Sequence, residues 1–225
     1  MNQVSKIYET GSVALQDVNI HIEHGEFVFI VGPSGAGKST LFKMLFREVQ
    51  PTSGEIFING TNILNLDDKE VPFLRRQLGI VFQDYRLLPD RTVYENVAFA
   101  MQVIEAPRRK INRRVLNVLE LVGLGDRADA YPSQLSGGEQ QRIAIARAIV
   151  NDPLLVIADE PTGNLDPETS WDIMEIFKEI NNSGTTIIMA THDKDIVDAM
   201  GKRVVAIEKG RIVRDEKNGG YGYEL

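Results

Sequence analysis

Residues 32–39 are Gly32-Pro33-Ser34-Gly35-Ala36-Gly37-Lys38-Ser39, which match the complete pattern of a phosphate-binding loop. The apolar run 26–31 before this loop predicts a buried strand, and the spacing after it predicts a helix over about 38–47. Glycines let the backbone curl until its N–H groups face phosphate oxygens, and the helix N-terminus adds partial positive charge. The strand–loop–helix order therefore predicts phosphate binding; the alternative is a glycine-rich turn that contains a lysine by chance.

The residues of this loop are expected to bind a nucleotide in different ways. The Lys38 ammonium should reach the β- and γ-phosphates, and the Ser39 hydroxyl should bind Mg²⁺. The remaining contacts expected from this stretch come from Gly32, Pro33, Ser34, Gly35, Ala36, Gly37 and Thr40. The predicted ligand is therefore a nucleotide with its magnesium ion.

Short apolar runs alternate with helical patterns along the chain, which is typical of an α/β fold. Strands are expected where Val18, Ile20 and Ile22 alternate with polar residues, and over residues 26–31, 55–58, 78–82, 154–158, 186–190 and 204–208. Helices are expected over about 38–47, 93–101, 113–122 and 167–181, and after Ser136. Because strand candidates are scarce from 84 to 150, we expect one domain, 1–225, whose core (1–83 and 151–225) is interrupted by a helical insert (84–150).

The composition of the 225 residues excludes several classes of protein. Apolar residues make up 43% and charged residues 25%, as in globular domains, and no apolar run approaches the about 20 residues of a membrane-spanning helix. Cysteine is absent, which excludes disulfides, thiolate zinc sites and thiol catalysis, and we expect no secretory signal. The net charge of −7 argues against nucleic acid as a partner, because binding to it needs a basic face.

The strand expected over 154–158 is followed directly by two carboxylates, Asp159 and Glu160. An acid at such a strand end can hold the Mg²⁺ of a phosphate-loop enzyme, which is the role we expect for Asp159. Glu160 is then placed to polarise an attacking water. Without a phosphate loop in the chain, the pair would instead be interpreted as a solvated acidic strand end.

A second glycine-containing turn, with the sequence LSGGEQQR over residues 135–142, opens a helix. The free N–H groups and the dipole of such a helix start form an anion site. The alternative is an ordinary helix cap, with Ser136 as the N-cap residue and Glu139 at the third position. The residues of this turn leave both interpretations open.

Residues 135–140 match the signature sequence of ABC-type ATPases, and the chain resembles this family over nearly its whole length. The family's other motifs follow in order: Tyr8 as the adenine-stacking aromatic, Gln83 as the Q-loop glutamine, residues 164–166 as the D-loop and His192 as the switch histidine. The resemblance implies the ABC-type nucleotide-binding fold, which is a phosphate-loop core with a small antiparallel β part and a helical insert.

The resemblance also implies Mg²⁺-dependent hydrolysis of ATP. Ser39 and Gln83 would bind the metal with support from Asp159, while Glu160 would act as general base. His192 would contact the γ-phosphate or the attacking water. Two chains would form an ATP-dependent head-to-tail homodimer, in which the signature turn of one chain covers the ATP of the other. The nucleotide contacts implied in this way are Tyr8, Gln83, Ser136, Gly137, Gly138 and Asp166.

Residues 160–166 resemble the branch that contains cell-division, lipoprotein-release and macrolide-export ATPases. Within it, the cell-division members are the most similar, over residues 31–37, 81–89 and 93–97, Trp171 and the tail 221–224. For the cell-division members, the resemblance implies an integral membrane partner, other division proteins and a place at the septum, on the cytoplasmic face of the bacterial membrane. The alternatives are an exporter ATPase, a clamp that binds ATP without turnover, and a ribosome- or nucleic-acid-acting cassette. Because the first strand would begin as early as Asn2, we expect the strand that opens the family's fold to be shortened in this chain.

Two segments are candidates for contact with a membrane or a partner. The basic cluster in residues 108–114 fits either a solvated helix face or contact with anionic lipid headgroups. The segment Tyr85–Pro89 should expose apolar side chains, because loops run over the surface. With the helix near Tyr94 and Phe99 it would form a groove for a short helix of the membrane partner, unless its leucines anchor the insert to the core.

Overall fold

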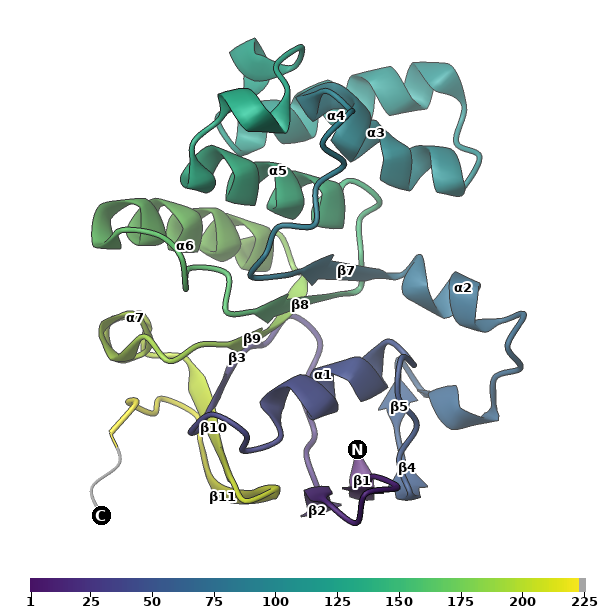
Figure 1. Ribbon diagram of the computed structural model, residues 1–225, viewed down its shortest axis with the longest axis vertical. Helices are drawn as coiled ribbons and strands as arrows, with labels where there is room; N and C mark the ends of the chain where they lie inside the picture. The colour runs from purple at the N-terminus through teal and green to yellow at the C-terminus, as the bar shows by residue number, and fades with distance from the viewer. Residues whose placement is uncertain (223–225) are drawn as a thin grey trace. The chain divides into compact units, whose positions relative to one another are not determined.

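The structure is a computed structural model that describes residues 1–222, so Tyr223 and Glu224 of the predicted family-specific tail lie outside the described residues. The chain divides into two compact units (Figure 1). The first contains Met1–Arg75 and the chain from Ile188 onward, and the second contains Arg76–Ile187. In the described part of the chain, no helix has the length and apolar character needed to cross a membrane.

The first unit is built on a mixed sheet in which the strands lie in the order β11-β10-β3-β9. Strand β10 is parallel to β3 and antiparallel to β11. All five residues of β3 are buried, because this strand is apolar throughout. The elements of this part are β3 (Phe27–Val31), α1 (Lys38–Leu45), β9 (Thr186–Ala190, shared with the second unit), α7 (Lys194–Met200), β10 (Arg203–Glu208) and β11 (Arg211–Glu216).

The same unit contains a small antiparallel sheet in the order β2-β1-β4 and a short hairpin, β5-β6. Its elements are β1 (Asn2–Ile7), β2 (Val13–Val18), β4 (Ser53–Glu55), β5 (Phe57–Ile58), β6 (Thr61–Asn62), a 3-10 turn (Ile63–Asn65) and α2 (Val71–Arg75). The antiparallel part expected from the family resemblance is therefore present, and the α/β fold class is confirmed.

Strand β1 has six residues and is hydrogen-bonded to β2 on one side and β4 on the other. Two expectations about the strands of this unit were wrong. The alternating residues Ile20 and Ile22 lie beyond β2, which ends at Val18, although Ile20 still exchanges two backbone hydrogen bonds with Met1, at 2.8 and 3.1 Å. The single strand expected over 55–58 is divided at the buried Ile56 into β4 and β5, which pair with different neighbours.

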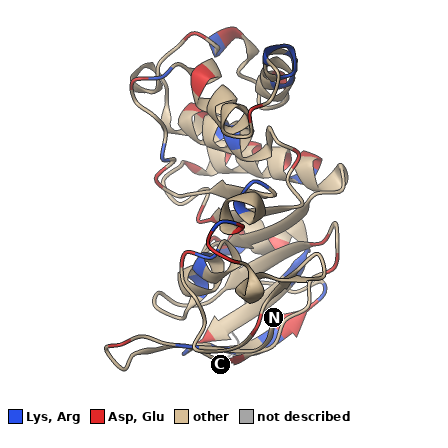
Figure 2. Cartoon of the chain, turned by 90° about the vertical axis from the view of Figure 1, so that its right-hand side faces the viewer, with Lys and Arg blue, Asp and Glu red and all other residues tan. Residues whose placement is uncertain are grey.

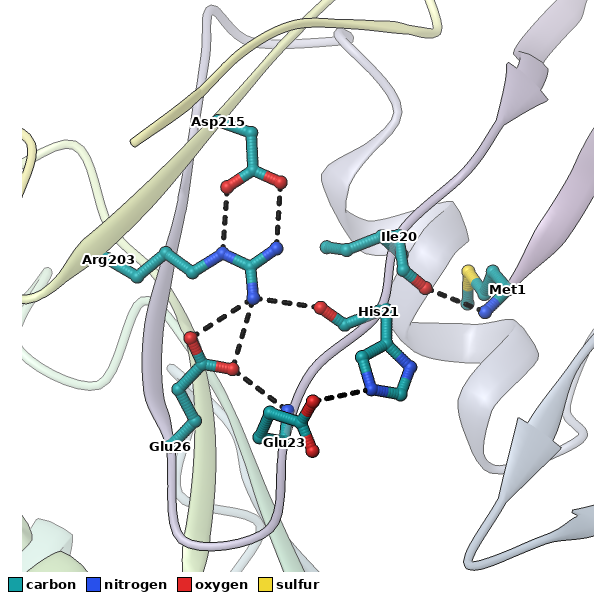
Figure 3. Close-up of polar contacts among 7 residues, drawn as sticks. All are labelled: Met1, Ile20, His21, Glu23, Glu26, Arg203 and Asp215. Atoms are coloured by element: carbon teal, nitrogen blue, oxygen red, sulfur yellow. Dashed lines mark hydrogen bonds and ion pairs between the residues drawn. The ribbon is translucent and has the colours of Figure 1, made fainter. Parts of the chain in front are cut away.

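A network of ion pairs around Arg203 fixes one edge of the mixed sheet (Figure 3). Arg203, at the start of β10, donates from Nε and Nη2 to the two carboxylate oxygens of Asp215 on β11, each at 2.7 Å. It also donates from Nη1 to Glu26 at 3.0 Å and to the carbonyl of His21 at 2.8 Å. The Asp215 hydrogen bonds raise the pKa of the Arg203 guanidinium above its ordinary value. The network thus ties β11 to the loop that leads into β3.

The second unit contains two parallel strands and four long helices. Its elements are β7 (Leu78–Val81), α3 (Val93–Val103), α4 (Arg108–Leu121), the 3-10 turns Gly125–Arg127 and Pro132–Gln134, α5 (Gly137–Ile149), β8 (Leu155–Asp159) and α6 (Pro167–Asn182). The prediction that residues from Thr92 to about Val150 are helical is confirmed. Helix α4 begins five residues earlier than expected, because Pro107 at the N-cap accepts hydrogen bonds from Lys110 and Ile111.

The basic residues of α4 differ in their surroundings. Arg108, Arg109, Lys110 and Arg113 are exposed on the first two turns. Figure 2 marks the lysine and arginine positions along the chain in blue. Arg114 is half-buried and donates to the carbonyl of Val150 at 3.1 Å, after the end of α5. One member of the predicted basic cluster is therefore a structural link between α4 and the chain that follows α5. The other four are exposed, which fits both a solvated face and contact with lipid headgroups.

Candidate nucleotide-binding site

The phosphate loop lies where the sequence predicted it, between the end of β3 and the start of α1. Gly32 has φ of 146°, and a Cβ at this position would collide with the carbonyl oxygen of Ile207 on β10. Gly37, the N-cap residue of α1, has φ of 114°, and a Cβ there would lie 2.5 Å from the carbonyl oxygen of Ala14. Both positions therefore require glycine, because the left-handed backbone and the close packing each exclude a side chain.

Lys38 points back over this loop. Its Nζ donates to the carbonyl oxygens of Gly32 at 2.7 Å and Pro33 at 3.2 Å. Helix α1 has neither a side-chain cap nor an acidic residue in its first turn, so the helix itself places no negative side chain at the positive end of its dipole. A backbone hydrogen bond also fixes the loop, because the N–H of Gly210 donates to the carbonyl of Ala36 at 3.0 Å. This geometry suits an anion such as phosphate.

Tyr8 lies beside the phosphate loop in the same unit. Its hydroxyl is 3.2 Å from the Thr40 Oγ1 on the first turn of α1, and 37% of the residue is exposed. A turn closed by Tyr8 N–H and the Ser12 carbonyl, at 2.9 Å, positions the residue after β1. The structure thus brings together Tyr8 and Thr40, which leaves an accessible aromatic ring next to the loop.

His192 also belongs to the first unit, two residues after the end of β9, and its side chain is exposed. The next residue, Asp193, is the N-cap of α7 and accepts a hydrogen bond from the Ile196 N–H at 3.1 Å. The Asp193 N–H donates in turn to the Thr191 hydroxyl at 3.0 Å. These bonds fix the backbone on both sides of His192 at the strand–helix junction.

The second unit brings Gln83 and the acidic pair to the same end of two paired strands. The register pairs Val81 with Ala158, so Gln83 and Glu160 each lie two residues beyond the pair. A Cβ on Gly163 would lie 2.9 Å from Gln83 Nε2, and Asn164 Nδ2 donates to the Gln83 carbonyl at 3.3 Å. Gln83 is therefore packed against the turn that follows the two acids.

The two acids occupy different backbone positions. Asp159 is the last residue of β8, whereas Glu160 has a left-handed φ of 50°, rare for a residue with a side chain. The N–H of Gly163 donates to the Glu160 carbonyl at 3.1 Å and closes the turn. The backbone therefore bends directly after β8, at Glu160 and the turn that follows it.

The signature turn is a helix cap as well as a candidate anion site. Ser136 Oγ accepts a hydrogen bond from the Glu139 N–H at 3.2 Å, and Glu139 accepts one from the Ser136 N–H at 2.8 Å. The latter bond lowers the pKa of the Glu139 carboxyl. The capping box predicted as the alternative is therefore present, and an anion role for Ser136, Gly137 and Gly138 stays a prediction.

Asp166 is likewise a helix cap. Its carboxylate accepts a hydrogen bond from the Thr169 N–H at 2.9 Å at the start of α6, and hydrogen bonds from Thr169 lower its pKa. A Cβ on the buried Gly138 would collide with the methyl group of Thr169. Thr169 thus links the signature turn to the D-loop, a contact that sequence reasoning missed because no local signal marks this threonine.

The three candidate metal ligands have suitable chemistry for Mg²⁺. Ser39 offers a hydroxyl, Gln83 an amide oxygen and Asp159 a carboxylate. All three are hard oxygen donors, which magnesium prefers, together with water and nucleotide phosphates. The residues present therefore fit the ion that the sequence implies.

The comparisons with known proteins identify the family of the chain. The family model described as ABC transporter matches residues 15–163. The chain is 58% identical over 222 residues to the cell division ATP-binding protein FtsE of Bacillus subtilis, with 99% of this chain and 97% of the relative covered. It is 57% identical over 224 residues to the protein of that name from Streptococcus pneumoniae, with 100% and 97% covered.

A solved structure, the dimeric post-hydrolysis state of an ATP-binding cassette bound to ADP and Pi, matches with a TM-score of 0.86 and 39% identity. The match covers 97% of this chain and 98% of that chain. The predicted family resemblance and the ABC-type fold are confirmed by these matches. The chain belongs to the ABC transporter family, as a cassette that binds and hydrolyses ATP.

Proposed function

We propose that this chain is the ATP-hydrolysing subunit of a bacterial cell-division complex and works with an integral membrane partner of the FtsX type. The observation that carries the proposal is the full-length identity of 57–58% to cell division ATP-binding proteins of two bacteria. The chain acts at the cytoplasmic face of the cell membrane, at the septum. There it couples ATP hydrolysis to hydrolysis of the septal wall, alongside other division proteins.

The chemistry we propose is Mg²⁺-dependent, and each group has a separate task. Lys38 and the loop N–H groups neutralise the phosphates, and Glu160 accepts a proton from the attacking water. His192 contacts the γ-phosphate or that water. Ser39, Gln83 and Asp159 are the proposed metal ligands. When bound, the ion neutralises charge on the phosphates.

The active species we propose is a head-to-tail dimer that forms with ATP. In it, Ser136, Gly137 and Gly138 of one chain cover the nucleotide of the other, and Asp166 contributes to the same interface. Support comes from the dimeric cassette with ADP and Pi, which is 39% identical to this chain. The proposed domain is single, 1–225, with the helical insert 84–150 carrying the signature turn.

Ser136 allows the capping role to be separated from the nucleotide role. Ser136→Ala should lower the free energy of unfolding by about 1 kcal/mol, because the Glu139 N–H loses its acceptor. Ser136→Asp should keep the cap and the stability, because aspartate is an equally good N-cap residue, but it places a negative charge against the phosphates. Urea titration measures the first effect, and light scattering with ATP measures dimer formation. An aspartate variant that dimerises like the wild type would contradict the proposed contact.

The partner surface we propose is formed by the loop 85–89 and helix α3. Leu87 and Leu88 are half-buried, and Phe99 is 48% exposed. The buried Asn96 fixes the loop to α3: its Oδ1 accepts from the Leu88 N–H at 2.8 Å, and its Nδ2 donates to the Leu88 carbonyl at 3.1 Å. The backbone is thus anchored while the apolar side chains stay accessible to a short helix of the partner.

Leu88→Asp tests this surface. The matched control is Val213→Asp, which also replaces an apolar residue by aspartate but lies on the exposed strand β11. The protein is co-expressed with an FtsX-type protein and captured from detergent-solubilised membranes. We expect Leu88→Asp to lose binding of the partner while its ATP turnover and melting temperature stay at the wild-type values. Val213→Asp should still bind the partner. Wild-type protein that captures a lipoprotein-release or macrolide-export membrane protein in place of an FtsX-type protein would overturn the cell-division assignment.

A further inference from the structure

Arg147, in the last turn of α5, holds the loop that follows β7. Its Nη1 donates to the carbonyl of Arg86 at 2.6 Å and its Nη2 to the carbonyl of Tyr85 at 2.8 Å. The planar guanidinium therefore binds two successive carbonyl oxygens with two different nitrogens, a geometry that a lysine ammonium does not reproduce. Burial lowers the pKa of Arg147, so its positive charge is kept in a desolvated position.

The loop held in this way has an unusual backbone. Tyr85 and Arg86 are both in the left-handed region, with φ of 57° and 49°, which residues with a side chain rarely occupy. The Arg86 N–H donates to the Asp84 carbonyl at 2.6 Å, and the Arg86 guanidinium lies 3.7 Å from the centre of the Phe82 ring. Two consecutive left-handed residues need an external constraint, and Arg147 supplies one at both of their carbonyls.

The same loop also touches the start of α5. A Cβ on Gly137 would lie 3.0 Å from the Tyr85 hydroxyl. Gly137 and Arg147 are ten residues apart on one helix, which corresponds to about 15 Å. Tyr85 is therefore attached to α5 at two distant points, its side chain at the signature turn and its carbonyl at Arg147. Gln83, two residues before Tyr85, belongs to the same short loop.

We propose that Arg147 is a positioning residue that locks the loop 82–86 onto α5, so that Gln83 and the signature turn 136–138 move as one rigid piece. The proposal rests on the roles proposed above for Gln83 and the signature turn. It assigns a task to a desolvated arginine that is not itself among the expected nucleotide contacts. A displacement at one end of α5 would reach Gln83 through the two carbonyl bonds, since Tyr85 is only two residues from Gln83.

The first test measures, in the protein without nucleotide, how strongly Arg147 protects the loop from opening. Amide hydrogen exchange over residues 84–88 is compared in the wild type, Arg147→Gln, Arg147→Lys and the control Arg91→Gln. Arg91 is an exposed residue of the same unit whose guanidinium pairs with Glu95 at 3.6 Å, so its substitution removes the same charge without freeing a carbonyl. We expect exchange to rise about tenfold in Arg147→Gln, less in Arg147→Lys and not in the control. Unchanged exchange in Arg147→Gln overturns the proposal.

The second test separates positioning from a merely structural role. In Arg147→Gln, kcat should fall about tenfold to a hundredfold, because a small displacement of a positioned group is costly. KM and the affinity for nucleotide should stay within about twofold of the wild type, since the phosphate loop is untouched. Arg147→Lys should recover part of kcat. Faster exchange with normal kcat, or loss of folding in both variants, overturns the proposal. A wild type without ATP turnover would refute the proposed function, while the exchange result would still decide whether the lock exists.

Discussion

Glu160→Gln is expected to lower ATP turnover by about 100- to 10,000-fold while nucleotide binding is retained. Glutamine keeps the size and the hydrogen bonding of the side chain but cannot accept the proton of the attacking water. Because hydrolysis would normally open the proposed dimer, the variant should accumulate as an ATP-bound dimer. Phosphate release measures the turnover, and light scattering with ATP and Mg²⁺ measures the dimer.

The matched control for this change is Glu175→Gln, on the exposed face of α6, where the carboxylate pairs with Lys178 at 2.7 Å. It removes the same charge from the same unit and should leave turnover unchanged. Near-normal turnover in Glu160→Gln would exclude Glu160 as the general base. Monomers alone, in both wild type and variant with ATP, would contradict the head-to-tail dimer.

The second large effect concerns binding. Lys38→Ala should weaken nucleotide affinity by about 10- to 100-fold, since a hydrogen bond to a charged group contributes about 1.5–3 kcal/mol. Among the described residues, the Lys38 ammonium bonds to two backbone carbonyls, at 2.7 and 3.2 Å, and to no carboxylate, so it can turn to a phosphate without losing a charged partner. Titration with a fluorescent nucleotide measures the loss of affinity.

Lys43→Ala is the control for Lys38, because Lys43 lies on the same helix and makes an exposed pair with Glu48 at 3.3 Å. A thermal melt without nucleotide should show both variants folded, with melting temperatures close to the wild type. If Lys38→Ala binds nucleotide as tightly as Lys43→Ala, residues 32–39 are not the phosphate site.

Local features of this protein could be predicted from the sequence because their causes lie within a few residues. Strand β9 covers Thr186–Ala190 as expected, since a short run of apolar, largely β-branched residues fits a buried strand. Helix α5 begins after Ser136, because the capping box involves residues only three apart. Strand β11 was missed: its sequence RIVRDE is mostly polar, and only its pairing with β10 makes it a strand.

The sequence by itself determined the phosphate loop, the family motifs and the α/β pattern, because each depends on a short run of residue types and their spacing. Only the tertiary structure decided what those motifs touch. Gln83 lies against Gly163 through the register of β7 and β8, and Arg147 reaches Tyr85 across 62 residues of chain. Such contacts depend on strand register and on how a helix packs against a loop, and no local pattern encodes either.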